Sequence, residues 1–152
     1  MKPIRNSAKA VLIRDGHILL TKNKDDKGYF YLFPGGGQEP KEELKDAVVR
    51  ECLEEIGRRV QVGELLHVRE YIGQNHQFAE WDADVHQVEF YFSCELIGVE
   101  TGGFSGSNPD SAQVGAEWVE IAKLDEIRLY PDTISKLLQA GKNGPCYLGD
   151  TN

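Results

Sequence analysis

The length, composition and charge of the chain exclude several classes of protein. Its 152 residues, of which 40% are hydrophobic and 28% charged, are typical of a single globular domain over 1–152 and not of a disordered chain. The net charge of −8 disfavours a long nucleic acid as a partner, because such binding needs a basic surface.

Two further features bear on the location of the protein. No apolar run approaches the roughly 18 residues that span a bilayer, and the first residues lack the apolar stretch of a secretory signal. The three cysteines, Cys52, Cys94 and Cys146, are odd in number and widely spaced, which argues against a disulfide framework or a zinc site. We therefore predict a cytoplasmic protein with reduced thiols and no membrane partner.

The hydrophobic pattern predicts many strands and few helices. In chain order, the predicted strands are 7–14, 17–22, 29–33, one or two within 60–72, then 86–97 and 117–121. Helices are expected at 41–56 and 131–140, with glycines placed to end them, and a helical turn at 123–127. The glycines after Pro34 are expected to break regular structure, and polar connections are expected at 23–28, 73–85 and 98–115. This order indicates a mixed α+β fold.

The first predicted helix carries the residues with the most chemistry. At 100° per residue, its apolar positions form one broad face made of Val48, Val49, Cys52, Leu53 and Ile56. Glu51, Glu54 and Glu55 fall together on another face, at i, i+3 and i+4. Three like charges repel one another unless a cation compensates them, and hard oxygen ligands suit Mg²⁺ or Mn²⁺. The helix is thus predicted to pack by one face and to bind a metal ion by the other.

The neighbours of these glutamates support the same chemistry. Arg50 could orient a carboxylate through its fork of donors, or contact a phosphate. Gly35 and Gly36 allow the backbone to approach closely, so that its carbonyls could ligate a metal and its amides could face a phosphate. The alternative is a solvated acidic surface, which is the commoner meaning of an isolated ExxEE run.

A longer pattern weighs against that alternative. The pattern specifies seven residues at fixed spacing. A random sequence would match all seven with odds of about 10⁻⁸ per starting position. They are Gly36, Glu42, Arg50, Glu51, Glu54, Glu55 and Gly57. The stretch GGQEPKEELKDAVVRECLEEIG resembles the signature box of the Nudix hydrolases, the MutT-like enzymes of nucleoside diphosphate-linked compounds. The Phe33-Pro34-Gly35-Gly36 run before it agrees, whereas Arg58 stands where an aliphatic residue is usual.

The resemblance implies an α/β/α sandwich around a mixed β-sheet. It also implies hydrolysis of a diphosphate linkage in a nucleoside diphosphate-X or nucleoside triphosphate, with water attacking phosphorus. Carried over by position, Glu51 and Glu55 match the principal metal-binding glutamates. Glu54 matches a further ligand or the residue that helps to activate water. The resemblance therefore implies Mg²⁺, with Mn²⁺ as an alternative.

Supporting roles follow from the same resemblance. Arg50 matches the arginine that orients the catalytic carboxylates, and Glu42 matches a supporting or outer ligand. Gly35 matches the loop that helps to hold the metal ion, and Gly36 is expected to approach the substrate. Glu117, before Trp118-Val119, stands where many Nudix proteins carry an extra acidic residue, so it is a further candidate metal ligand; its alternative role is an ordinary surface residue.

The substrate is less well specified. Lys22 and Lys24 follow the second predicted strand and could contact phosphate, although a solvated role is the alternative for each lysine. The segments 73–85, which contains Trp81, and 98–115 are expected to carry specificity. The charge of −8 favours a small nucleotide as partner over long RNA. A homodimer is expected only because many relatives pair.

Three functional hypotheses follow. The first is the metal-dependent hydrolase described above. The second is a catalytically silent Nudix-fold module that binds or senses nucleotides, which would be expected to have lost box carboxylates that this chain keeps. The third is an acidic interaction domain with a coincidental box, which the odds of a chance match disfavour.

Overall fold

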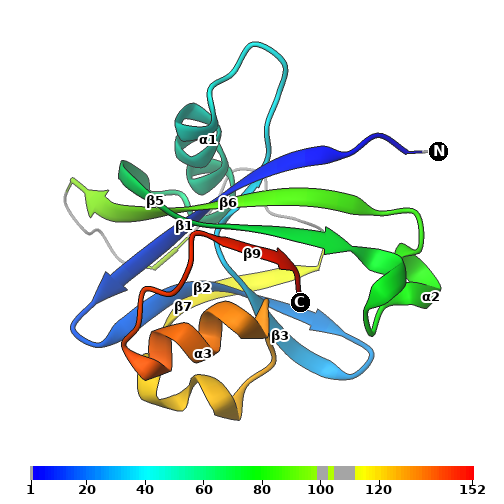
Figure 1. Cartoon of the computed structure of the whole chain (residues 1–152). Helices are drawn as coiled ribbons and strands as arrows, with labels where there is room; N and C mark the ends of the chain where they lie inside the picture. Colours follow the sequence, from blue (N-terminus) through cyan, green and yellow to red (C-terminus); the bar gives the residue numbers. More distant parts are fainter. Residues whose placement is uncertain (1, 99–102, 105–111) are drawn as a thin grey trace.

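Over residues 2–98, 103–104 and 112–152, which the computed structural model describes, the chain forms a mixed nine-stranded β-sheet that curls between two helices (Figure 1). The hydrogen-bonded order is β8-β3-β2-β1-β6-β5-β9, with β4 on β1 and β7 on β2. The strands are β1 (Arg5–Arg14), β2 (His17–Asp25), β3 (Gly28–Leu32), β4 (Gly35–Gly37), β5 (Arg59–Ile72), β6 (His86–Ile97), β7 (Gln113–Glu120), β8 (Leu129–Tyr130) and β9 (Tyr147–Asp150). The α-helices are α1 (Leu44–Ile56), α2 (Ala79–Asp82) and α3 (Asp132–Ala140), and two 3₁₀ helices are η1 (Gly73–Asn75) and η2 (Ile121–Glu126).

Strand β1 joins the two halves of the sheet. It turns into β2 through Asp15 and Gly16, which both have positive φ angles, as the tight hairpin predicted from the sequence requires. Its other edge runs parallel to β6, from Arg5 beside Gln87 onwards. Residues on β1 therefore contact strands that are far apart in the sequence.

Helix α1 packs on one side of the sheet and α3 on the other (Figure 1). The first core lies under α1 and comprises Ala8, Ala10, Leu12, Leu19, Ala47, Val48, Cys52, Ile56, Val60, Phe92 and Cys94. The second core includes Ile134 of α3 together with Ile18, Leu20 and Phe33. The expected α+β sandwich around a mixed sheet is confirmed.

The predicted bounds of α1 were wrong at one end. The helix begins at Leu44 and not at residue 41, because Lys41 has a φ of 70°, which no α-helix accommodates. Its C-terminal end was correct: Gly57 has a φ of 67° and donates its N–H to the Leu53 carbonyl. Leu53 itself is 40% exposed, so its expected place on the packing face was also wrong.

Three predicted irregular segments are partly strands. The glycine run that was expected to break regular structure forms β4, in which 35–37 pair with 7–9 of β1. Strand β2 continues to Asp25, so Lys24 lies in a strand and not in a loop. The predicted connection 98–115 falls partly outside the described residues, and its last three positions begin β7.

Other expectations can be compared directly with the structure. Cys52 and Cys94 are free and buried, and Cys146 is free and exposed. Among the helices of the described chain, none combines the length and apolarity that a bilayer crossing needs.

A charged pair is buried where β5 meets β6. The Arg69 Nε donates to the Glu89 Oε1 at 2.8 Å, and the Tyr91 hydroxyl donates to the same oxygen at 2.5 Å. Burial alone would raise the pKa of the Glu89 carboxyl, but the charge of Arg69 and the hydrogen bonds hold that pKa below its ordinary 4.5. This carboxylate therefore stabilises the folded state above about pH 4.5, and its contribution is lost as the pH falls further.

We expect Glu89→Gln to lower the free energy of unfolding at neutral pH by about 2 kcal/mol, because a hydrogen-bonded charge opposite Arg69 is lost. The variant should also lose less stability than the wild type between neutral and acidic pH. Urea unfolding across this pH range measures both effects. Glu95→Gln, at an exposed position of β6, is the control and should behave as the wild type. Parallel pH curves for Glu89→Gln and the wild type would contradict the assignment.

Candidate active site

The C-terminal half of α1 meets the glycines of β4. The Gly35 N–H donates to the Glu55 Oε2 at 3.2 Å, and Glu55 is only 6% exposed. A Cβ added at Gly36 would lie 2.5 Å from the carboxyl carbon of Glu51. Glu51 therefore lies directly over Gly36, and only a glycine leaves room for its carboxylate at this position.

These two glutamates line a polar cavity of about 300 Å³, which we call the carboxylate cavity. Its lining residues are Arg5, Asn6, Ser7, Lys9, Gly35, Gly36, Gly37, Glu51, Glu55 and Gln87. The cavity thus combines two carboxylates, two cationic side chains and the polar backbone of β4.

Arg50 holds the surrounding carboxylates in place. It makes two hydrogen bonds to Glu42, from Nε to Oε2 at 2.8 Å and from Nη2 to Oε1 at 3.0 Å. Its Nη2 also donates to the Gly37 carbonyl at 2.8 Å, which ties α1 to β4. The same guanidinium lowers the pKa of Glu42 through these hydrogen bonds. Arg50 therefore connects Glu42, before α1, with the backbone of β4.

The remaining donor of Arg50 links two of the three predicted metal ligands. Nη1 donates to Glu51 at 2.9 Å and to Glu54 at 3.3 Å. The structure therefore brings Glu51 and Glu55 together in the carboxylate cavity, whereas Glu54 turns toward Arg50 and is not among the lining residues. Burial raises the pKa of Glu51 despite the attraction of Arg50, and the nearby charge of Glu54 adds to the rise.

The donor set fits a hard divalent cation. Among residues 2–98, 103–104 and 112–152, no three His, Cys, Asp or Glu side chains form a cluster that could hold a metal ion. Mg²⁺, however, is usually held by one or two carboxylates, by water and by substrate phosphate oxygens, and seldom by a cage made only of protein ligands. Glu51 and Glu55, with an adjoining polar cavity, meet that requirement.

Glu117 lies in different surroundings. It accepts a hydrogen bond from the Tyr31 hydroxyl at 2.8 Å, and its second oxygen lies 3.9 Å from the Lys22 Nζ. Burial and the nearby Glu117 charge raise the pKa of Tyr31 to about 12. Lys22 also lies over the Tyr29 ring, 4.2 Å from its centre. Glu117 and Lys22 thus contact each other and do not line the carboxylate cavity; their predicted roles stay predictions.

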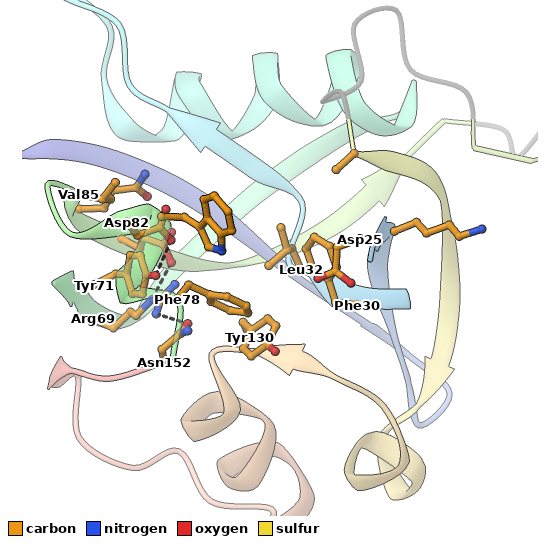
Figure 2. Close-up of a pocket in the computed structure, with 15 residues that line it drawn as sticks. Asp25, Phe30, Leu32, Arg69, Tyr71, Phe78, Asp82, Val85, Tyr130 and Asn152 are labelled. Carbon is orange, nitrogen blue, oxygen red and sulfur yellow. Dashed lines mark hydrogen bonds and ion pairs between the residues drawn. The ribbon is translucent and has the colours of Figure 1, made fainter. Parts of the chain in front are cut away.

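Lys24 lines a second cavity of about 430 Å³, which we call the aromatic cavity (Figure 2). Its lining residues are Lys24, Asp25, Phe30, Leu32, Arg69, Tyr71, Phe78, Trp81, Asp82, Val85, Gln87, Glu89, Ala112, Tyr130 and Asn152. Gln87 lines both cavities, so the two adjoin.

Two cations of the carboxylate cavity were missed from the sequence. Arg5 and Lys9 lie on β1, and the Lys9 Nζ donates to the Phe33 carbonyl at 3.4 Å. A signal was present: positions 5, 7 and 9 are polar and alternate with the small buried residues Ala8 and Ala10, as a strand with one polar face requires. The alternation indicates a shared face but not what lies opposite it.

Comparison with known proteins supplies the family. A family model, the NUDIX domain, matches residues 3–139. A CTP pyrophosphohydrolase from Escherichia coli (strain K12) is 38% identical over 76 residues, which cover 47% of this chain and 56% of that protein. An ADP-ribose pyrophosphatase from Methanocaldococcus jannaschii is 31% identical over 136 residues, covering 88% of this chain and 72% of that protein.

Coverage differs among the relatives. The match spans 29% of a putative nudix hydrolase from Caenorhabditis elegans and 35% of a nucleoside triphosphatase NudI from Escherichia fergusonii. With the 56% of the CTP pyrophosphohydrolase, the chain covers less than two thirds of these three relatives.

Solved structures share the fold. A NUDIX hydrolase from Nitrosomonas europaea superposes with a TM-score of 0.70 at 20% identity, over 92% of this chain and 91% of that one. A MutT NUDIX hydrolase from Burkholderia pseudomallei gives a TM-score of 0.67 at 24% identity, over 88% and 96% respectively. With a family model that matches most of its length and a fold that agrees, the chain belongs to the Nudix family.

Proposed function

We propose that this chain, acting as one domain, is a metal-dependent pyrophosphohydrolase that cleaves a diphosphate linkage in a nucleotide-like substrate. The observation that carries the proposal is the meeting of Glu51 and Glu55 in one cavity beside the backbone of β4. A solvated acidic surface would not bury Glu55 or lay Glu51 across a glycine. These contacts favour a carboxylate pair that serves a ligand.

The position of each residue around the carboxylate cavity suggests its role. Glu51 and Glu55 would hold Mg²⁺ or Mn²⁺, with the backbone at Gly35 close by. When bound, the metal ion neutralises diphosphate charge and makes hydroxide available near neutral pH. Glu54 would orient the attacking water or take its proton, because its carboxylate is half-buried beside Arg50. Arg50 keeps Glu51 and Glu54 oriented through its hydrogen bonds.

The acidic chain must still bind a polyanion. Arg5 and Lys9 line the carboxylate cavity and would attract substrate phosphates, while the Gly36 backbone can approach a phosphate oxygen closely. Lys24 in the aromatic cavity and Lys22 nearby are further candidate contacts. The relatives named as a CTP pyrophosphohydrolase and an ADP-ribose pyrophosphatase support a small nucleotide as the substrate class.

The test is release of phosphate or pyrophosphate from a panel of nucleoside triphosphates, nucleotide sugars and dinucleoside polyphosphates. We expect release from at least one compound with Mg²⁺, none after chelation with EDTA, and recovery when Mg²⁺ or Mn²⁺ is added back. If a nucleotide binds but no compound releases phosphate or pyrophosphate, the enzyme hypothesis is wrong and the silent nucleotide-binding module takes its place. Release that EDTA leaves unchanged would remove the metal ion from the proposal.

A further inference from the structure

Strand β9 ends in a carboxylate that holds the segment 73–85. The strand pairs in parallel with β5, at one edge of the sheet (Figure 1). The Asp150 carboxylate accepts a hydrogen bond from the Ile72 N–H at 2.9 Å, where β5 ends. It accepts two more from the turn that follows, from the Asn75 Nδ2 at 2.9 Å and from the His76 Nε2 at 2.6 Å. We call these three contacts the Asp150 clasp.

The carboxylate of the clasp carries a charge. Burial by itself would raise the pKa of Asp150, but the hydrogen bonds of the clasp, led by the one from Asn75, hold that pKa below its ordinary 3.8. Hydrogen bonds to a charged acceptor are roughly twice as strong as those between neutral groups. Removal of this one side chain therefore leaves three donors without their acceptor.

The clasped segment forms one wall of the aromatic cavity. The Tyr71 ring stacks on the His76 ring, with centres 5.6 Å apart and planes at 18°. The Tyr71 hydroxyl donates to Asp82 at 2.6 Å (Figure 2). The residues of the segment that line the cavity are Phe78, Trp81, Asp82 and Val85. Tyr71 therefore connects the clasp with this wall, although Asp150 itself is not a lining residue.

The segment 73–85 contains little regular structure of its own. Helix η1 has three residues and α2 has four, and none of the α2 residues is buried. The Gly73 N–H donates to the Val85 carbonyl at 2.9 Å, which closes the segment on itself but does not tie it to the sheet. Surface segments of this kind open locally at low cost unless specific contacts hold them. The position of the segment thus depends on contacts such as the clasp.

The two residues after β9 continue the contact. The Arg69 Nη1 donates to the Thr151 carbonyl at 2.6 Å and to the Asn152 Oδ1 at 3.0 Å (Figure 2). The Asn152 Nδ2 donates to the Gln77 Oε1 at 3.3 Å, and Asn152 lines the aromatic cavity. The end of the chain described here therefore joins β5 to the segment 73–85 beside this cavity.

We infer that Asp150 is a positioning residue: its clasp keeps the segment 73–85 in the conformation that shapes the aromatic cavity before a substrate arrives. The inference rests on the proposed function, which places the reacting diphosphate in the carboxylate cavity, and the two cavities adjoin at Gln87. A preformed wall spares the substrate the entropy cost of ordering it. Asp150 lines neither cavity, so it acts on KM and not on the chemical step.

The first experiment needs no substrate. Asp150→Ala removes the acceptor of all three hydrogen bonds, and we expect the backbone amides of 73–85 to exchange with deuterium at least about tenfold faster. The urea midpoint should change little, since neither core contains a residue of the clasp. Asp84→Ala makes the same change at an exposed position of the same segment and should exchange as the wild type.

The second experiment separates binding from chemistry. On the best nucleotide of the panel, Asp150→Ala is expected to raise KM by about tenfold and to leave kcat within about twofold of the wild type. Asp150→Asn keeps the shape and one acceptor oxygen without the charge, so it should recover most of the loss in KM and in amide protection. Asp84→Ala should show wild-type kinetics. If Asp150→Ala does not fold, Asp150→Asn replaces it in both measurements, with smaller changes in the same direction.

Three results overturn the inference while the proposed function stands. They are unchanged amide exchange in Asp150→Ala, faster exchange with an unchanged KM, and a fall in kcat as large as the rise in KM. The proposed function fails in a different way, if no compound of the panel is hydrolysed. The affinity for CTP, measured by equilibrium dialysis in EDTA, then replaces KM in the same comparison, and equal affinities of the wild type and Asp150→Ala overturn the inference.

Discussion

Replacement of Glu55 by glutamine is expected to lower kcat by about 10²–10³-fold, because one of the two carboxylates that we propose to hold the metal ion loses its charge. Glutamine keeps an oxygen that can accept the hydrogen bond from the Gly35 N–H, so the fold should survive. Steady-state kinetics on the best nucleotide of the panel measures the loss, and the urea midpoint checks the fold.

The matched control lies on the same segment. Glu43 is exposed immediately before α1, and Glu43→Gln should keep the wild-type kcat. Glu54→Gln tests the neighbouring role: a loss of the same order as for Glu55→Gln is expected if Glu54 takes the proton of the attacking water. Wild-type turnover in Glu55→Gln would remove the carboxylate pair from the chemistry.

A single methyl group at Gly35 is expected to destabilise the fold by at least about 3 kcal/mol. The residue has a φ of 139°, which side chains rarely tolerate. An added Cβ would overlap the Ala8 carbonyl oxygen and lie 2.7 Å from the Lys9 Cα, so backbone would have to move. Urea unfolding of Gly35→Ala measures the change.

Gly115→Ala is the control for the methyl group itself. Apart from its chain neighbours, no heavy atom of the described residues lies within 4 Å of a Cβ built there, and its φ lies outside the left-handed region. We expect its free energy of unfolding to stay within about 0.5 kcal/mol of the wild type. Equal midpoints for Gly35→Ala and Gly115→Ala would show that β4 can move away from β1 at little cost.

Local patterns predicted much of the fold. The Asp15-Gly16 hairpin and the end of α1 at Gly57 both depend on residues with positive φ. Such positions can be predicted from the sequence, because they favour glycine. The box predicted that Glu51, Glu55 and Arg50 belong to one region, and they do lie together around β4. These features involve short stretches of chain, where spacing alone determines which side chains meet.

Features set by distant partners could not be predicted in this way. Three successive glycines carry no side-chain pattern, so the sequence does not indicate that they pair with β1. Helical periodicity placed Leu53 inward and Glu55 outward, but the Gly35 N–H offers Glu55 a buried partner. The aromatic cavity draws Phe30, Phe78 and Tyr130 from three separate segments, and no single segment indicates that they meet.

The parallel pairing of β1 with β6 has a consequence for how the molecule comes into being. Arg5 and Gln87 are register partners that stand 82 positions apart (87 minus 5). A long loop must therefore close before the β6 residues that line both cavities are in place. Until the ribosome has released β6, one edge of β1 stays open to mispairing with other chains. The period of greatest risk of aggregation is thus synthesis, before either cavity can bind a ligand that would stabilise it.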